Sequence, residues 1–344
     1  MYWFMYLKNK LCILWFLCLC MSTWAQEPFR VMFYNVENLF DTKDDSLKND
    51  NEFLPESPKR WTYKRYQDKL TKIAKVIIAS GNENVPDLVG LSEVENDTCI
   101  RDLVKYSPLR EAGYRYVMTN SPDERGIDVA LLYQRSTFKL LNKKEITIPH
   151  QKLGYSPTRN ILHVTGQVIS GDTIDVFVCH MPSRAGGESK SEPFRILTCH
   201  ELKKAVDTVM HTRKNPYTII MGDFNDYPSN RSLTQSLGAM NPIQGIEPLK
   251  LYNLMYNMKG GTNRYRGEWG ILDQIIVSGS LLHQSNNIFT SPTKAQIIHH
   301  PFLLEEDDKY GGNMPLRTYI GMKYHNGYSD HLPVCVDLII HYSW

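Results

Sequence analysis

The chain has 344 residues, of which 42% are hydrophobic and 22% charged, and 39 basic side chains stand against 37 acidic ones. This composition is typical of a folded globular protein and excludes a disordered, collagen-like or coiled-coil chain. Proteins that hold nucleic acid by bulk charge are usually strongly basic, so any polyanion must be held here by a local patch.

The first 25 residues have the pattern of a secretory signal peptide. Lys8 and Lys10 precede an uncharged apolar run over residues 11–21, and small residues precede a cleavage position after Ala25. The run is shorter than the roughly 20 residues of a membrane span, and no later segment is apolar enough to cross a bilayer. We therefore expect a secreted or periplasmic mature chain, 26–344, with 37 basic and 37 acidic residues.

Four of the seven cysteines lie beyond this leader, at Cys99, Cys179, Cys199 and Cys335. They contain no paired C-x-x-C motif, which argues against a zinc site. A domain of this size needs no disulfide framework, and whether the cysteines pair stays open. Cys179 and Cys335 lie in apolar runs, where we expect small buried residues.

The mature chain alternates polar loops with short apolar runs that predict buried strands. In chain order the predicted strands are 29–34, 87–91, 129–133, 173–178, 217–221, 272–277 and 333–340. The spacing of apolar residues predicts helices over 63–80 and 192–210. Pro193 suits the first turn of the second helix, with Ser191 near its cap. Strands that alternate with helices indicate an α/β domain whose sheets are covered by helices.

Two polar stretches interrupt this pattern. Residues 41–59 predict a long surface loop, and residues of about 293–329 predict a late insertion in an otherwise single domain. Long ordered loops are often functional, although a run of charges is more often a solvated face.

Polar residues that bind metals or move protons follow or begin several of the predicted strands. They are Asn35, Glu93, His180, Asp223, Asn225, Asp273, Asp330 and His331. Strand ends of one direction lie at one edge of a sheet, so these side chains can converge. Strand capping or turn chemistry explains any one of them alone, but their recurrence indicates a site.

The residue types suggest metal-assisted hydrolysis of a phosphate ester by water. Oxygen ligands without cysteine suit a hard cation such as Mg²⁺, for which Glu93 and Asp330 are the best candidates. His331 is a candidate base near neutral pH. His180 can face the anionic centre that forms during reaction, and Asn225 can donate to a phosphoryl oxygen. The chain has neither a G-x-S-x-G elbow nor a P-loop.

In their order and spacing, seven stretches resemble the endonuclease/exonuclease/phosphatase superfamily, which includes DNase I, abasic-site endonucleases, inositol-polyphosphate 5-phosphatases and bacterial sphingomyelinases. They are FYNVENLF (33–40), LVGLSEVEN (88–96), RGIDVALLY (125–133), FVCHMPSRAGG (177–187), IIMGDFND (219–226), WGILDQIIVS (269–278) and YSDHLPV (328–334). They cover the mature chain nearly end to end. The resemblance implies the DNase I-like fold, a four-layer α-β-β-α sandwich with two packed mixed β-sheets.

The resemblance also implies a metal site. Glu93 looks like the principal Mg²⁺ ligand, assisted by Asn35 and Asp330, with Mn²⁺ or Ca²⁺ as alternative ions. Glu37, two residues after Asn35, is either a further ligand or a plain surface acid.

The same resemblance implies catalytic roles for five residues. His331 looks like the residue that activates or positions the attacking water, and Asp273 looks like the acid that orients it. Asp223 resembles the family acid that orients water or helps the leaving group. Asn225 resembles the residue that holds the scissile phosphate, and His180 the one that stabilises the pentacovalent phosphate.

Three functions remain open on the sequence. The favoured one is a secreted Mg²⁺-dependent phosphodiesterase that acts as a nuclease on DNA or RNA, although the zero mature net charge weakens it. The second is the same chemistry on sphingomyelin, an inositol phosphate or a nucleotide. The third is a non-catalytic binding module. Such a module would have lost at least one of the eight site residues, but all eight are present, which favours an enzyme. Arg184 and Arg317 are candidate substrate contacts. We expect a monomer with no obligate protein partner.

Overall fold

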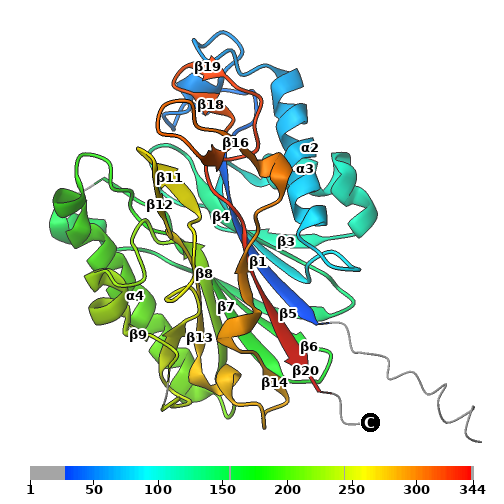
Figure 1. Ribbon diagram of the computed structural model, residues 1–344, viewed down its shortest axis with the longest axis vertical. Helices are drawn as coiled ribbons and strands as arrows, with labels where there is room; N and C mark the ends of the chain where they lie inside the picture. The colour runs from blue at the N-terminus through cyan, green and yellow to red at the C-terminus, as the bar shows by residue number, and fades with distance from the viewer. Residues whose placement is uncertain (1–27, 155, 244, 342–344) are drawn as a thin grey trace, which may run out of the picture.

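The computed structural model describes residues 28–154, 156–243 and 245–341, apart from the side chains of residues 152 and 153. Two seven-stranded mixed β-sheets pack face to face within these ranges, and helices cover their outer faces (Figure 1). This confirms the four-layer α-β-β-α sandwich. The signal peptide predicted over residues 1–25 lies outside the described residues. Within those residues, no helix is both long and apolar enough to cross a bilayer.

The first sheet is centred on the long strand β1. In spatial order its strands are β14 (Ile288–Phe289), β20 (Val334–Ile340), β1 (Phe29–Leu39), β2 (Leu88–Val94), β4 (Asp128–Tyr133) and β3 (Arg115–Met118), with β15 (Ala295–Ile297) also paired to β20. β1 runs parallel to β2 and antiparallel to β20. The ends of β1 and β2 and the start of β20 therefore lie at one edge.

The second sheet repeats this arrangement. In spatial order its strands are β5 (Phe138–Ile146), β6 (Ile161–Val168), β7 (Thr173–His180), β8 (Tyr217–Asp223), β13 (Asp273–Ser278), β10 (Leu251–Asn253) and β9 (Ala239–Met240). β7 runs parallel to β8, and β13 runs antiparallel to β8. The ends of β7 and β8 therefore meet the start of β13.

Alternate residues of the central strands build different layers of the core, because successive side chains of a strand point to opposite faces. Val31 of β1 packs in the cluster between the two sheets. Met32, the next residue, packs on the other face with apolar side chains of α2 (Tyr63–Ala79) and α3 (Asp97–Tyr106). Burial on both faces explains why these strands are continuous apolar runs in the sequence.

The outer face of the second sheet is covered by α4 (Glu188–Thr212), where Ile220 packs with Leu202 of the helix. This helix begins four residues before the predicted start, so Pro193 lies inside it and Ser191 is not its cap. The guanidinium of Arg195, which is fully buried, pairs with Asp226 at 2.8 Å and donates to Ser191 Oγ at 2.8 Å. These contacts hold the first turn in helical form although proline supplies no N–H.

Shorter elements complete the chain. The small strands outside the two sheets are β11 (Asn263–Tyr265), β12 (Glu268–Gly270), β16 (Leu304–Glu306), β17 (Asn313–Pro315), β18 (Tyr319–Ile320) and β19 (Lys323–Tyr324). The short helices are η1 (Asn51–Phe53), η2 (Pro108–Ala112), η3 (His150–Leu153), η4 (Ser232–Leu237), η5 (Gly279–Leu282), η6 (Pro292–Lys294) and η7 (Pro301–Leu303). The predicted late insertion contains β15, which belongs to the first sheet, and two small hairpins.

The four cysteines of the described chain, Cys99, Cys179, Cys199 and Cys335, are buried free thiols. This agrees with the small buried residues expected at Cys179 and Cys335. No pair of these four forms a disulfide.

Candidate active site

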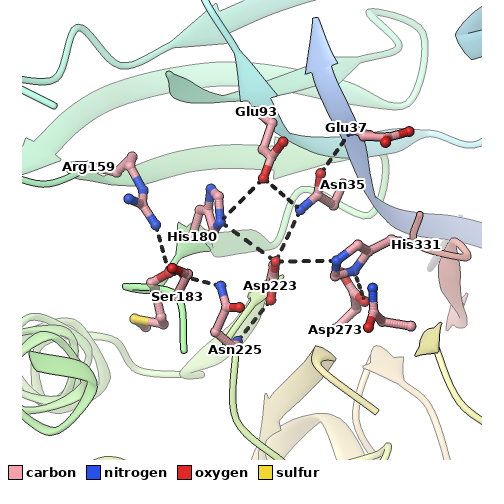
Figure 2. A network of polar contacts seen from close by, with 12 residues as sticks. Asn35, Glu37, Glu93, Arg159, His180, Ser183, Asp223, Asn225, Asp273 and His331 are labelled. Carbon is pink, nitrogen blue, oxygen red and sulfur yellow. Dashed lines mark hydrogen bonds and ion pairs between the residues drawn. The ribbon is translucent and has the colours of Figure 1, made fainter. Parts of the chain in front are cut away.

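Strand termini of both sheets meet at one edge of the sandwich and bring polar side chains together (Figure 2). These side chains are Asn35 (β1), Glu93 (β2), His180 (β7), Asp223 (β8), Asp273 (β13) and His331, which lies just before β20. The pairing register sets His180 opposite Asp223, and Asp223 opposite Asp273, on neighbouring strands. The convergence expected from the sequence is present in the structure.

Register shifts in the strand pairing set the direction of two acidic side chains, Glu37 and Glu93. The pairing of β1 with β2 shifts register between Asn35 and Leu39, and Glu37 has a φ of 51° there. The pairing of β2 with β4 shifts between Ser92 and Val94, and Glu93 has a φ of 62°. Such bulges redirect a side chain at a strand end, and strained residues of this kind often lie at functional sites.

Gly222 allows β7 and β8 to approach closely beside Asp223. A Cβ atom at this position would lie 2.3 Å from the carbonyl oxygen of Cys179, which no side chain could tolerate. The glycine of the G-D-F-N sequence therefore has a structural reason to precede the acid.

His331 and Asp273 form a buried hydrogen-bonded pair. The His331 Nδ1 atom lies 2.7 Å from Asp273 Oδ2, and both residues are buried. Ser329 fixes the turn before the histidine, because its Oγ donates to Asn35 O at 2.7 Å and accepts the His331 N–H at 3.1 Å. Burial lowers the pKa of His331, but Asp273 and Asp223 outweigh it and hold that pKa well above its ordinary value.

Asp223 stands at the centre of the cluster. Its Oδ2 accepts Asn35 Nδ2 at 3.0 Å and lies 3.6 Å from His180 Nε2 and 3.8 Å from His331 Nε2. Its Oδ1 accepts the backbone N–H of Asn225 at 2.8 Å. Burial raises the pKa of Asp223 to about 7, with His331 opposing the rise and Asp273 adding to it. Asp223 and His331 therefore each favour the charged form of the other.

Glu93 lies on the other side of Asn35. Its Oε2 accepts the backbone N–H of Asn38 at 2.9 Å, while Oε1 lies 3.5 Å from Asn35 Nδ2 and 3.9 Å from His180 Nε2. One carboxylate oxygen thus faces the cluster without a short hydrogen bond. The Asn35 Oδ1 atom accepts the Glu37 N–H at 3.0 Å. Because its amide nitrogen faces Glu93, the ligand role expected for Asn35 stays a prediction.

More charged groups gather beside Glu93. Arg317 Nη2 donates to Asp330 Oδ2 at 2.8 Å, and its Nε lies 3.5 Å from Glu37 Oε1. Burial and the charge of Asp330 raise the pKa of Glu37, while Lys69 and Arg317 oppose the rise. Glu37 is therefore not a plain surface acid. Carboxylate oxygens without sulfur suit a hard divalent cation, so this set fits such an ion. The role of Glu93 as principal Mg²⁺ ligand stays a prediction.

A second group also has the composition of a metal site. One ligand atom from each of Asp223, Asp273 and His331 lies within 4.8 Å of the others. The His331 Nδ1 and Asp273 Oδ2 atoms are already joined by a hydrogen bond, so an ion bound through these two atoms would replace that bond. Glu93 and this second group predict different positions for a bound ion.

His180 and Asn225 flank Asp223. Burial, then the positive charges of Arg159 and Arg125, lower the pKa of His180 well below its ordinary value. The His180 Nδ1 atom is buried and has no hydrogen-bond partner among the described residues. Asn225 has a φ of 50° and donates its amide to Met181 O at 3.1 Å.

Arg184 turns toward the loop that carries Asn225. Its Nε donates to Asn225 O at 2.7 Å, and its Nη2 donates to Asp226 Oδ1 and Asn230 Oδ1, each at 3.0 Å. Arg184 therefore positions the Asn225 loop, and its role as a direct substrate contact stays a prediction.

Two arginines near the centre were not identified from the sequence. Arg159 is buried and donates to Met181 O, the carbonyl that also accepts Asn225. Arg125 donates to the Oδ1 atom of Asn38 at 2.6 Å, next to Glu93. Arg125 begins the stretch RGIDVALLY (125–133). An arginine in a polar loop gives no functional signal of its own, because such residues are usually solvated.

Comparison with known proteins identifies the family. The model of the Endonuclease/Exonuclease/phosphatase family matches residues 30–339. The chain belongs to this family. Its members are phosphoester hydrolases, and this protein is such an enzyme. No curated protein sequence matches the chain significantly.

Solved structures share the fold at low sequence identity. A family protein from Bacteroides thetaiotaomicron is 16% identical with a TM-score of 0.57, and the match covers 90% of this chain and 97% of that one. A mannosyl-6-phosphatase from the same organism is also 16% identical, with a TM-score of 0.55 and coverage of 91% and 100%. The human Nocturnin catalytic domain with bound sulfate is 19% identical, with a TM-score of 0.54 and coverage of 91% and 94%.

Proposed function

We propose that the protein is a secreted, Mg²⁺-dependent phosphoesterase whose centre lies between Glu93 and His331. The observation that carries this proposal is the chain of contacts between these two residues. Asn35 Nδ2 lies 3.5 Å from Glu93 Oε1 and 3.0 Å from Asp223 Oδ2. The same Asp223 oxygen lies 3.8 Å from His331 Nε2. A metal-bound phosphoryl group can bridge such a separation.

The chain's own residues supply positioning and proton transfer. Asp273 fixes the imidazole of His331 so that Nε2 faces Asp223. His331 and Asp223 position the attacking water, and Asp223 accepts its proton. His180 Nε2 and the Asn225 amide lie beside Asp223 and donate to phosphoryl oxygens. Mg²⁺ held by Glu93 would neutralise charge on the phosphate. The water oxygen bonds to phosphorus and the ester P–O bond breaks. The proton that Asp223 takes from the water passes through the Asp223–His331 pair to the leaving oxygen, which departs as the alcohol.

A compact phosphate ester is the substrate class that the geometry favours. Cationic side chains around the centre are mostly paired with carboxylates, as in Arg159 with Asp123 and Arg317 with Asp330. Cations that are already paired suit one phosphate group with a small substituent better than a long polyanion.

Nucleic acid, the substrate favoured by the sequence, is the second candidate. A structure of D. rerio TDP2 holds a single-strand DNA product and is 12% identical to this chain, with a TM-score of 0.54. A single strand needs a short contact surface rather than a broad basic trough.

Secretion is proposed from the leader sequence. The strand β1 begins at Phe29, just after the cleavage position predicted at Ala25. Removal of the leader would therefore leave every described strand and helix in place.

The test is a parallel activity screen of the mature protein, residues 26–344, with Mg²⁺ and with EDTA. The substrates are p-nitrophenyl phosphate, bis-p-nitrophenyl phosphate, a sugar phosphate, sphingomyelin, single-stranded DNA and RNA, and the control is His331→Ala. We expect Mg²⁺-dependent hydrolysis of a compact ester, which His331→Ala abolishes. Cleavage of only the nucleic acids would support the second candidate. Absence of hydrolysis in every arm would contradict the proposed function.

A further inference from the structure

The loop between β3 and β4 is held firmly against the neighbouring 41–59 loop. Lys48 Nζ donates to the carbonyl oxygens of Ser121 and Asp123 at 3.0 and 2.9 Å. The backbone N–H of Asn49 donates to Glu124 O at 2.8 Å. Backbone positions over residues 121–124 are therefore fixed by partners from a different part of the chain.

Two buried acids fix the same loop from within. Asp128 accepts the Ser121 N–H at 2.9 Å and also the hydroxyl groups of Ser121 and Thr119. Asp123 Oδ1 accepts the Arg125 N–H at 3.0 Å, while its Oδ2 accepts Arg159 Nη1 at 3.1 Å. The backbone at Arg125 is thus preorganised, although the residue itself is exposed.

The side chain of Arg125 reaches the candidate metal ligand through one intermediary. Its Nη2 donates to Asn38 Oδ1 at 2.6 Å, and the Asn38 N–H donates to Glu93 Oε2 at 2.9 Å. The charge of Arg125 also acts on His180, whose pKa it helps to lower. The guanidinium therefore lies near both Glu93 and His180.

The other arginines around the centre pair with carboxylates, whereas the side chain of Arg125 donates to a neutral amide. Arg159, Arg184 and Arg317 pair with Asp123, Asp226 and Asp330, respectively. Among residues 28–154, 156–243 and 245–341, no carboxylate pairs with the Arg125 side chain, and its hydrogen-bond partner is a neutral amide. Its positive charge is therefore available to an anion.

We propose that Arg125 binds a non-bridging oxygen of the substrate's scissile phosphate. A guanidinium makes strong charge-assisted hydrogen bonds to phosphate oxygens, and its fixed donors add directional specificity. A cation held in place before the substrate arrives stabilises the phosphate without reorganisation. The inference rests on the proposed function and names a substrate-binding residue for the same site.

The test compares Arg125→Gln and Arg125→Lys with Arg135→Gln in the mature protein. Arg135 is an exposed arginine just beyond the far end of β4 and serves as the matched control. Calorimetric titration with inorganic phosphate in saturating Mg²⁺ gives a binding constant independent of turnover. Kinetics on the preferred ester of the screen give the KM and kcat.

We expect Arg125→Gln to weaken phosphate binding by about 10-fold or more, in the range for loss of a charged hydrogen bond. Arg125→Lys should recover part of the affinity, because it restores the charge without the fork of donors. Arg135→Gln should match the wild type, and all three variants should melt at wild-type temperature.

Phosphate affinity of Arg125→Gln within twofold of the wild type would overturn the inference, as would a wild type that binds no phosphate. Absence of hydrolysis by a wild type that still binds phosphate through Arg125 would instead contradict the proposed function. The two failures are therefore distinguishable.

Discussion

Asp273 Oδ2 lies 2.7 Å from His331 Nδ1, although the two residues are 58 positions apart and enter the site from different sheets. The hydrogen bond leaves Nε2 as the nitrogen that faces the centre, 3.8 Å from Asp223. Asp273 thereby sets the orientation of the imidazole, as a partner of a functional histidine commonly does.

Loss of this histidine should remove most of the activity. We expect His331→Ala to lower kcat by about 100-fold or more, the range for loss of a group that takes part in proton transfer. Asp273→Asn should lower it by a smaller factor, because the imidazole remains but loses its fixed orientation. The double variant should be no slower than His331→Ala alone, because the two residues act as one unit. Steady-state kinetics on one ester measure all three, with the exposed His211→Ala as control.

Additive losses in the double variant would show that Asp273 and His331 act separately. A wild-type kcat for His331→Ala would remove the histidine from the mechanism altogether.

Neutralising Glu93 should impair both metal binding and catalysis. We expect Glu93→Gln to raise the Mg²⁺ concentration for half-maximal activity by at least about 10-fold, because it removes the principal anionic ligand. Glu201→Gln is a matched control, since the two side chains are 15% and 16% exposed and Glu201 lies on α4. Mg²⁺ titrations of activity and calorimetry check both variants. An unchanged metal titration in Glu93→Gln would eliminate this role.

We expect the hydrogen bonds of Lys69 to stabilise the segment that contains Arg317. Its buried Nζ donates to Thr318 Oγ1 at 2.6 Å and to Tyr328 O at 2.7 Å, and burial lowers its pKa to about 8. Lys69→Met should lower the free energy of unfolding by about 3 kcal/mol, because it leaves buried acceptors and Glu37 without their cation. Urea unfolding measures this.

Lys64→Met is the control for this experiment, since that side chain is 84% exposed on the same helix. The two variants should differ clearly. Equal unfolding free energies would mean that Lys69 contributes nothing to holding the segment.

Asp175 should stabilise the protein in a pH-dependent way far from the site. It is buried and accepts His163 Nε2 at 2.9 Å and Arg213 Nε at 2.8 Å, and its pKa is lowered to about 2. Burial opposes this lowering, but the hydrogen bonds outweigh it. The ordinary pKa of an aspartate is about 3.9, so the stabilisation is complete above about pH 4 and is lost as the pH falls through about 2.

We expect Asp175→Asn to destabilise the protein by at least about 2 kcal/mol between pH 5 and 7, with the deficit shrinking from pH 4 to pH 2. Urea unfolding across this range measures it, with the half-exposed Asp68→Asn as control. Because Asp175 lies five residues before His180, about 17 Å along the strand, kcat at low temperature should stay unchanged. A deficit that grows on acidification would contradict the sign of this effect.

Most of the long central strands could be predicted from the sequence because both of their faces are buried, although the buried strand β6 was missed. All seven predicted runs correspond to strands of the two sheets, from β1 to β20. By contrast, β5 is mostly exposed, so the run of Lys139 to Ile146 shows little apolar pattern. The helix α3 was also missed, because ten residues give few turns of periodicity, although Asn96 caps it by accepting the Cys99 N–H. The predicted start of α4 was too late, because Pro193 is typical of a first helical turn. The contacts of Arg195 that hold the earlier turn form only in the folded protein.

The candidate site was predictable in its residues but less so in its contacts. Glu93 and Asp223 lie at the ends of their strands and His331 lies just before one. Parallel strand ends share an edge of the sheet. The partners of flexible side chains depend on loops that meet only in the fold. Arg184 therefore turned toward Asn225 and Asp226, and Arg125 toward Asn38, without any local sequence signal.

The position of a bound divalent ion tests the central claim most directly. Crystals of the mature protein soaked in Mn²⁺ would reveal that position in an anomalous difference map. We predict a peak whose nearest protein oxygen belongs to Glu93, with the His331–Asp273 hydrogen bond intact. A single peak among Asp223, Asp273 and His331, with that hydrogen bond broken, would contradict the account.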